Sequence, residues 1–277
     1  MVNPKLSIRD ILSRKVQGQK IVAITAYDCT FARLFDQAGV DILLVGDSLG
    51  MAVQGHDTTL PVTLDEMIYH ARAVARAQPR AHLVVDLPFM SYQVSVEQAL
   101  QSAGRALKES GCESVKLEGG RALVPHVKAC VAAGIPVMGH LGLTPQSVRA
   151  FGGFRVQGRT EAEQERLLQD AQLLEQAGAY AIVLEGIPAD LAAKVTSTLS
   201  IPTIGIYAGP HCDGQVLVCY DLLGLQPELK LRFVKRYAEL GTTAIEATRR
   251  YVQDVQSGQF PGSTHSLVPE AKPESKA

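Results

Sequence analysis

The sequence predicts an α/β protein that folds as a single (β/α)8 barrel of the TIM type. Eight short apolar segments alternate with helical or loop segments over about 250 residues, which is the usual size of this barrel. Capping boxes at Thr63–Glu66, Ser95–Gln98 and Thr160–Glu163 mark the starts of three of the helices. The main alternative is a doubly wound open sheet, but no Walker A or GxGxxG motif follows a strand.

The predicted elements follow from apolar periodicity and from residues that start or stop helices. The expected strands are Ile21–Ala26, Asp41–Asp47, His82–Asp86, Ser114–Glu118, Ile135–His140, Tyr180–Glu185, Ile201–Tyr207 and Gln215–Tyr220. The expected helices are Thr30–Gln37, Thr63–Ala77, Ser95 to just before Gly111, Leu123–Val131, Thr160–Ala177, one that opens near Pro188, Leu231–Leu240 and Thr243–Gln256. A Gly-rich excursion, Gly142–Gly158, contains Thr144-Pro145, which favours a short helix. We expect the barrel to span residues 1–262 and a frayed polar tail to span residues 263–277.

Composition and charge indicate a soluble globular protein. Hydrophobic residues make up 46% and charged residues 20%, and the formal net charge is −1, which disfavours nucleic acid or an anionic membrane as a partner. No apolar run is long enough to cross a bilayer, and the first 20 residues lack the apolar core of a signal peptide. The five cysteines show no CxxC spacing, which is typical of reduced thiols. We therefore expect a cytoplasmic location.

Five predicted strands end on side chains that bind metals or carry protons. They are Asp47, Asp86, Glu118, His140 and Glu185. Because parallel strands bring their carboxyl ends to one face, we expect these residues to converge at one mouth. Three carboxylates ~5 Å apart would repel by ~3 kcal/mol per pair at an effective dielectric near 20, and a hard cation would relieve that repulsion. Asp47, Asp86 and Glu118 are therefore candidate Mg²⁺ ligands, although either aspartate alone could simply cap a helix.

Lys116, His140 and Glu185 are the candidate catalytic residues. Lys116 and Glu118 are two positions apart on one strand, so both side chains should face the barrel interior. Lys116 beside a cation suits an anionic oxo acid, and a partly desolvated Glu185 suits a general base. His140 would orient the substrate or stabilise an oxyanion. The structural alternatives are a Lys116–Glu118 ion pair, a loop cap for Glu185 and a buried structural histidine.

Several stretches around these residues closely resemble the ketopantoate hydroxymethyltransferase family. They are Leu44–Met51, Gln54–Thr63, Asp86–Met90, Val115–Gly120, Gly139–Ser147, Phe151–Arg159 and Phe260–Gly262. The resemblance implies a (β/α)8 barrel enzyme of pantothenate biosynthesis. Such enzymes transfer a hydroxymethyl group from 5,10-methylenetetrahydrofolate to 3-methyl-2-oxobutanoate, which gives 2-dehydropantoate, and they assemble as stacked-ring homodecamers.

The resemblance also implies roles for individual residues. The residues that match the family's site for one Mg²⁺ are Asp47, Asp86 and Glu118. Those that match its oxo-acid contacts are Asp47, Ser48, Asp86 and Lys116, and the proton acceptor is Glu185. In the implied mechanism, Mg²⁺ chelates the keto and carboxylate oxygens, Glu185 removes the C3 proton, and the resulting enolate attacks the one-carbon unit.

One position departs from the family pattern. Family members typically read Gly-Ile-Gly-Ala-Gly at the end of the seventh strand, whereas this chain has Tyr207 within Gly205–Gly209. A ring there would narrow the pocket or alter how the folate docks, because it stands where backbone would approach a ligand. The candidate catalytic residues are unchanged.

Three other functions remain open from the sequence. One is a Mg²⁺-dependent oxo-acid C–C lyase or mutase of the isocitrate-lyase type, but its cysteine- or histidine-bearing gating loop is missing. Another is a Schiff-base aldolase that uses Lys116. The last is an inactive barrel that serves as a binding module, which the retained strand-end charges disfavour.

Overall fold

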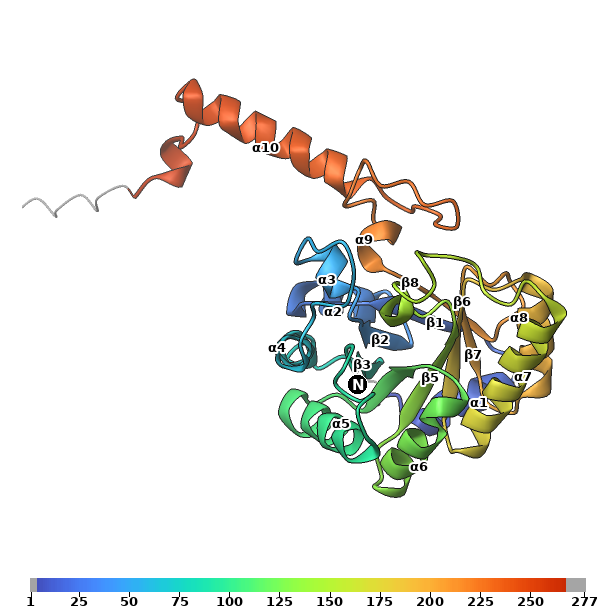
Figure 1. Ribbon diagram of the computed structural model, residues 1–277. Helices are drawn as coiled ribbons and strands as arrows, with labels where there is room; N and C mark the ends of the chain where they lie inside the picture. The colour runs from blue at the N-terminus through green and yellow to red at the C-terminus, as the bar shows by residue number, and fades with distance from the viewer. Residues whose placement is uncertain (1–3, 268–277) are drawn as a thin grey trace, which may run out of the picture. The chain divides into compact units, whose positions relative to one another are not determined.

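The computed structural model describes residues 4–267 and shows a closed barrel of eight parallel strands (Figure 1). The strands are β1 Ile21–Thr25, β2 Ile42–Val45, β3 His82–Asp86, β4 Ser114–Glu118, β5 Val137–Gly142, β6 Ala181–Glu185, β7 Thr203–Ile206 and β8 Gly214–Leu217. Each strand pairs with the next in sequence, and β8 pairs with β1 to close the barrel. The predicted fold class is confirmed.

Helices form an outer layer around this barrel (Figure 1). They are α2 Cys29–Gln37, α4 Leu64–Ala75, α5 Val96–Ser110, α6 Val124–Ala132, α7 Glu161–Gln176 and α8 Ala189–Thr198. The capping boxes expected at Thr63 and Thr160 are complete, and the Ser95 side chain accepts from the N–H of Gln98. Short helices α3 Leu49–Ala52, η1 Arg121–Leu123 and η2 Pro145–Ser147 lie in the connections.

Helix α1, Ile8–Val16, was not anticipated from the sequence and packs on the barrel core. Its Ile11 is fully buried in a cluster with inward-facing strand residues such as Ile42, Val84 and Ile204. These residues lie near the amino ends of their strands, so α1 fills that end of the barrel. The apolar filling leaves the opposite, carboxyl end for polar side chains.

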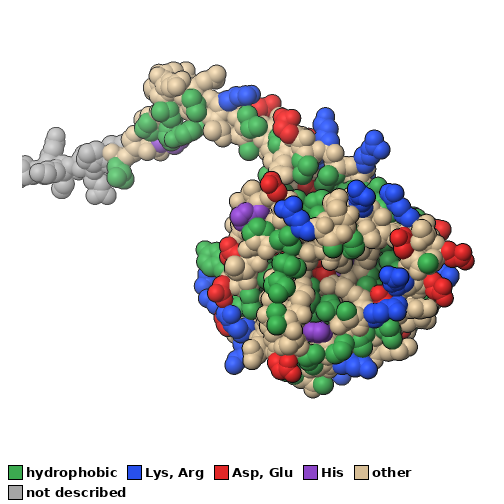
Figure 2. Space-filling model, in the orientation of Figure 1, with side chains coloured by type: hydrophobic (Ala, Val, Ile, Leu, Met, Phe, Trp, Pro, Cys, Tyr) green, Lys and Arg blue, Asp and Glu red, His purple; other side chains and the backbone are tan. Residues whose placement is uncertain are grey.

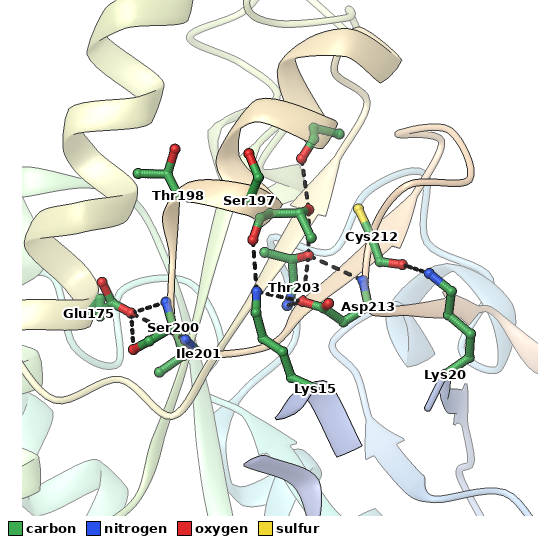
Figure 3. A network of polar contacts seen from close by, with 12 residues as sticks. Lys15, Lys20, Glu175, Ser197, Thr198, Ser200, Ile201, Thr203, Cys212 and Asp213 are labelled. Atoms are coloured by element: carbon green, nitrogen blue, oxygen red, sulfur yellow. Dashed lines mark hydrogen bonds and ion pairs between the residues drawn. The ribbon is translucent and has the colours of Figure 1, made fainter. Parts of the chain in front are cut away.

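A polar network joins α1 to the two last strands (Figure 3). Lys15 Nζ lies 2.9 Å from Asp213 Oδ2 and also donates to the carbonyl oxygen of Thr196. The same Asp213 oxygen accepts from the backbone N–H of Thr203, the first residue of β7. The strands β7 and β8 share two ladder pairs, at Ile204–Gly214 and Gly205–Gln215, so this carboxylate adds a third link where these two strands meet.

The chain divides into two compact units, residues 1–219 and 220–277. All eight strands belong to the first unit, so this division falls before the domain boundary expected at residue 262. The second unit contains α10 Leu240–Gln256 and η3 Ser263–His265. Of the expected tail, residues 268–277 lie outside the described residues. Among residues 4–267, no helix is both long and apolar enough to span a membrane.

The helix expected at Leu231–Leu240 is wrong, since no helix forms before Leu240 in that segment. The backbone of this segment forms hydrogen bonds with another part of the second unit. The N–H groups of Tyr237 and Leu240 donate to the carbonyl oxygens of Leu222 and Leu223. The Arg236 guanidinium also donates to the carbonyl oxygen of Gln226. These tertiary hydrogen bonds replace the i to i−4 ladder that the local pattern favoured.

Candidate active site

The predicted site residues come together at the carboxyl ends of the barrel strands. Strand register sets Asp86 beside Lys116, and Glu118 beside His140. The space-filling view shows acidic side-chain atoms near the middle of the barrel face, with most charged side chains toward its rim (Figure 2). Asp47 lies two residues beyond the end of β2, and His140 lies within β5 rather than at its end.

Lys116 is the centre of a buried charge cluster. Its Nζ lies 3.1 Å from Asp86 Oδ1, 3.6 Å from Glu118 Oε1 and 3.0 Å from His140 Nδ1. The side chains of these residues are almost fully buried. A buried charge without partners would be strongly unfavourable, so the Lys116 ammonium partly offsets the burial of the Asp86 and Glu118 carboxylates. The expected Lys116–Glu118 ion pair exists, but as one part of a larger cluster.

His140 connects this cluster to Glu185 at the end of β6. His140 Nδ1 lies 3.4 Å from Glu118 Oε1, and its Nε2 lies 3.3 Å from Glu185 Oε2. Burial and the Lys116 charge lower the pKa of His140, but the two carboxylates outweigh them and raise it to about 9. The two carboxylates therefore favour the protonated imidazole, whereas the nearby Lys116 ammonium favours the neutral one. Glu185 remains partly open, with its side chain 18% exposed.

The sequence reasoning gave no role to Gln146, which lies in η2 and contacts two of the candidate ligands. Its side-chain Nε2 donates to Asp47 Oδ2 at 2.9 Å, and its backbone N–H donates to Glu118 Oε2 at 3.0 Å. Tyr92, also unassigned, lies beside it and is fully buried. Both residues lie between a strand and the next long helix, and only their burial marks them as part of the site.

Ser48 lies next to the cluster. Its hydroxyl is 2.8 Å from the Tyr27 hydroxyl. A side chain at Gly46 would clash with the same Ser48 oxygen, because an added Cβ would lie 2.8 Å from it and 3.4 Å from Asp86 Oδ2. Glycine thus lets the chain after β2 turn closely past Asp86, and the backbone N–H of Asp47 reaches Asp86 Oδ2 at 3.1 Å.

The charge balance of the site suits a divalent cation. The acidic side chains Asp47, Asp86, Glu118 and Glu185 face only two basic ones, Lys116 and His140. Burial raises the pKa of Asp47 well above its usual value, as do the charges of Glu118 and Asp86. Burial also raises the pKa of Asp86 despite Lys116, whereas His140 and Lys116 outweigh burial and lower the pKa of Glu118 to about 2.

The oxygen donors also match hard-metal chemistry. Asp86 Oδ1 is buried and accepts no hydrogen bond with good geometry, although Lys116 is close. Carboxylate oxygens with no thiol among them favour Mg²⁺. Within residues 4–267, no three His, Cys, Asp or Glu side chains are placed so that they could hold a metal ion together. The residues fit Mg²⁺ by charge and donor type alone, and the ligand set stays a prediction.

Tyr207 follows β7 directly at this end of the barrel and has a left-handed backbone, with φ of +52°. This region is costly for a residue with a bulky side chain and is natural for glycine. The backbone conformation is thus the one suited to the glycine that the resemblance places there. The ring is 49% exposed, so the substitution adds an aromatic surface near Glu185, whose strand partner is Ile206.

Comparison of the sequence with known families gives a match over residues 5–263 to the model described as ketopantoate hydroxymethyltransferase. The chain is 57% identical over 263 residues to the 3-methyl-2-oxobutanoate hydroxymethyltransferase of Pelobacter propionicus, covering 95% of this chain and 97% of that protein. It is 51% identical to the enzyme of that name from Geobacter sulfurreducens, covering 96% of this chain and all of the relative.

Among solved structures, phosphonopyruvate hydrolase in complex with oxalate and Mg²⁺ aligns with a TM-score of 0.60 and 14% identity, covering 93% of this chain and 92% of that one. The 2,3-dimethylmalate lyase of the PEP mutase/isocitrate lyase superfamily aligns with a TM-score of 0.59 and 20% identity, covering 98% and 93%. These likenesses show a shared fold alone. The sequence matches show the family as well as the fold, because they span nearly the whole chain at high identity. This chain belongs to the ketopantoate hydroxymethyltransferase family of enzymes.

Proposed function

We propose that this protein transfers a hydroxymethyl group from 5,10-methylenetetrahydrofolate to 3-methyl-2-oxobutanoate, which gives 2-dehydropantoate for pantothenate biosynthesis. The observation that carries the proposal is the continuous chain of contacts from Asp86 through Lys116 and His140 to Glu185 at the barrel mouth. These contacts would provide anion binding, cation binding and proton transfer in one place. The relatives named for this reaction support the choice of oxo acid.

Asp47, Asp86 and Glu118 would hold one Mg²⁺ ion. When bound, the ion would polarise the keto group of the oxo acid and make the C3 proton more acidic. The excess of acidic side chains supports this assignment, as does the Mg²⁺ and oxalate complex of a protein with the same fold. Asp47, Ser48, Asp86 and Lys116 are the proposed contacts to the oxo acid.

The chain's own residues would then handle charge and proton. The Lys116 ammonium stabilises the negative charge that develops on the oxo acid, since it is buried and already fixed by carboxylates. Glu185 accepts the proton from C3, and the electron pair left at C3 forms the new C–C bond to the one-carbon unit. Both carbon–nitrogen bonds between that unit and the folate break, and tetrahydrofolate leaves. Water supplies the hydroxyl oxygen, and the proton held by Glu185 returns to the product. His140 acts on Glu185 through charge, because its Nε2 lies 3.3 Å from Glu185 Oε2 without forming a hydrogen bond of good geometry.

Proton exchange tests this proposal directly. The full-length protein is mixed with 3-methyl-2-oxobutanoate in D₂O with Mg²⁺ or with EDTA, and proton NMR follows the C3 methine. We expect loss of the methine signal only with Mg²⁺, and formation of 2-dehydropantoate once methylenetetrahydrofolate is added. A methine that stays unchanged under all these conditions, with no product, would contradict the proposal.

The isocitrate-lyase type of C–C lyase is the second candidate, because solved structures of that superfamily share the fold. The two functions differ in what happens to the oxo acid. A lyase would cleave 2,3-dimethylmalate without folate, whereas the proposed transferase would leave it intact. The same NMR sample with that compound separates the two candidates.

We also propose that the protein is a homo-oligomer, with the decamer of the family as the expected size. In the second unit, α10 exposes Ile245, Val252 and Val255, each more than 40% accessible. Their spacing places them on one stripe of the helix, which would bury apolar surface against another copy of the chain. Light scattering coupled to gel filtration measures the mass, and a monomer at micromolar concentration would contradict this proposal. A cytoplasmic location also stays a prediction.

A further inference from the structure

Gln146 uses every hydrogen-bonding position of its buried side-chain amide. Nε2 donates to Asp47 Oδ2 and to the carbonyl oxygen of Leu87, both at 2.9 Å. Oε1 accepts from the Tyr92 hydroxyl at 2.7 Å and from Gln93 Nε2 at 3.0 Å. An amide has two donors and two acceptor positions, so none is left over. Such complete pairing in a residue only 5% exposed indicates a fixed orientation.

The neighbours of Oε1 determine which way the amide faces. Tyr92 has one hydroxyl proton, and its closest acceptor is Gln146 Oε1, while the hydroxyl oxygen accepts from the backbone N–H of Glu118 at 3.1 Å. Gln93 also presents a donor to Oε1. A flipped amide would set its oxygen against two other acceptors, Asp47 Oδ2 and the carbonyl oxygen of Leu87, and its N–H group against the Gln93 donor. The donor side of Gln146 must therefore face Asp47.

The backbone of Gln146 adds a second contact to the site. Its N–H donates to Glu118 Oε2 at 3.0 Å. Gln146 thus donates hydrogen bonds to one oxygen of Asp47 and to one oxygen of Glu118. Asp47 follows β2, and Glu118 lies at the end of β4. Its bond to Leu87 also joins it to the residue that follows Asp86 and β3. The three segments that carry the candidate ligands meet at this single residue.

We propose that Gln146 is a positioning residue that holds Asp47 and Glu118 in the orientation in which they bind a divalent cation together with the oxo acid. The inference rests on the proposed function. Gln146 touches the ligand carboxylates rather than the reacting atoms, so it acts through them. Loss of such outer contacts commonly weakens metal binding about 10-fold to 100-fold.

Cation binding, rather than turnover, tests this role. Free Mn²⁺ is measured by electron paramagnetic resonance while full-length protein is titrated with and without 3-methyl-2-oxobutanoate. Gln146→Leu removes the amide, and Gln146→Asn keeps an amide too short to reach Asp47. We expect both variants to raise the Mn²⁺ dissociation constant about tenfold. Gln93→Leu is the matched control, because it loses a bond to the same amide without touching a carboxylate, and it should stay within about twofold of the wild type.

The outcomes separate the two proposals. If the wild type binds no Mn²⁺ with the oxo acid, the proposed function fails. If the wild type binds and both Gln146 variants bind equally well, only the positioning role is overturned. A purely structural role would lower the unfolding temperature of the metal-free protein and leave the dissociation constant unchanged. Should neither Gln146 variant fold, Tyr92→Phe is the substitute, because it removes the 2.7 Å bond to Gln146 Oε1 and also the hydroxyl that accepts from the Glu118 backbone N–H. It must raise the constant severalfold, and an unchanged value would overturn the inference.

Discussion

Asp213→Ala should markedly destabilise the barrel without touching the active site. The carboxylate accepts from the Lys15 ammonium and from the Thr203 backbone N–H, both at 2.9 Å, at the seam between β7 and β8 (Figure 3). The Asp213 and Lys15 side chains are 17% and 15% exposed, so water replaces the lost partner poorly. The β7–β8 ladder, with two pairs, cannot compensate.

The size of the effect follows from these contacts. Breaking a buried ion pair from one side costs about 3 to 5 kcal/mol, because the remaining charge stays buried. Lys15 keeps its bond to the Thr196 carbonyl oxygen, which favours the lower end of that range, about 3 kcal/mol. For a chain of this size, that corresponds to a fall of roughly 6 to 12 °C in unfolding temperature.

Urea unfolding followed by circular dichroism, with the metal removed, measures this free energy. Asp65→Ala is the control, because Asp65 forms a 2.7 Å ion pair with Arg105 but its side chain is 79% exposed. Surface pairs contribute little, so the control should unfold like the wild type. If Asp213→Ala and Asp65→Ala lose the same stability, the seam carboxylate is not the link that the geometry indicates. Lys15→Met should recover part of the loss in the double variant, since it removes the orphaned charge.

Three further predictions concern the site and the fold. Asp86→Asn should abolish most of the turnover and the Mg²⁺-dependent methine exchange, and near-normal activity would exclude Asp86 as a ligand. Burial lowers the pKa of His82, although the Glu113 charge opposes this shift. The folded protein therefore favours the neutral imidazole, and this contribution to stability is fully present above about pH 6.5. It is lost as the pH falls through the pKa of His82 in the folded protein. The stability difference between wild type and His82→Phe should therefore shrink from pH 7.5 to pH 5.5 in urea titrations, and a constant difference would refute this. Tyr207→Gly should not destabilise the protein, because glycine avoids a backbone cost of roughly 1 to 2 kcal/mol at this φ. Tyr207→Val should destabilise it. Equal unfolding temperatures for the two variants would contradict the inference that the backbone is strained at this position.

The sequence was sufficient for the fold and for the main candidates of the site. Strand ends at Asp86, Glu118 and Glu185 were read correctly because parallel strands are short apolar runs that stop at polar residues. Helix starts at Thr63 and Thr160 followed from side chains that bond their own first turn. Both signals are local, so they survive without knowledge of the tertiary structure.

Only the tertiary structure revealed what surrounds the candidate residues. Gln146 contacts Asp47, 99 positions away in the sequence, and Tyr92 contacts Gln146, 54 positions away. The packing of Ile11 from α1 and the missing helix before Leu240 were likewise decided by distant partners. These are Ile204 for the first and the Leu222 and Leu223 carbonyl oxygens for the second. Local patterns record which face of an element is apolar and where it is capped. They do not record which loops the barrel register brings together, and that register decides how the carboxylates are held.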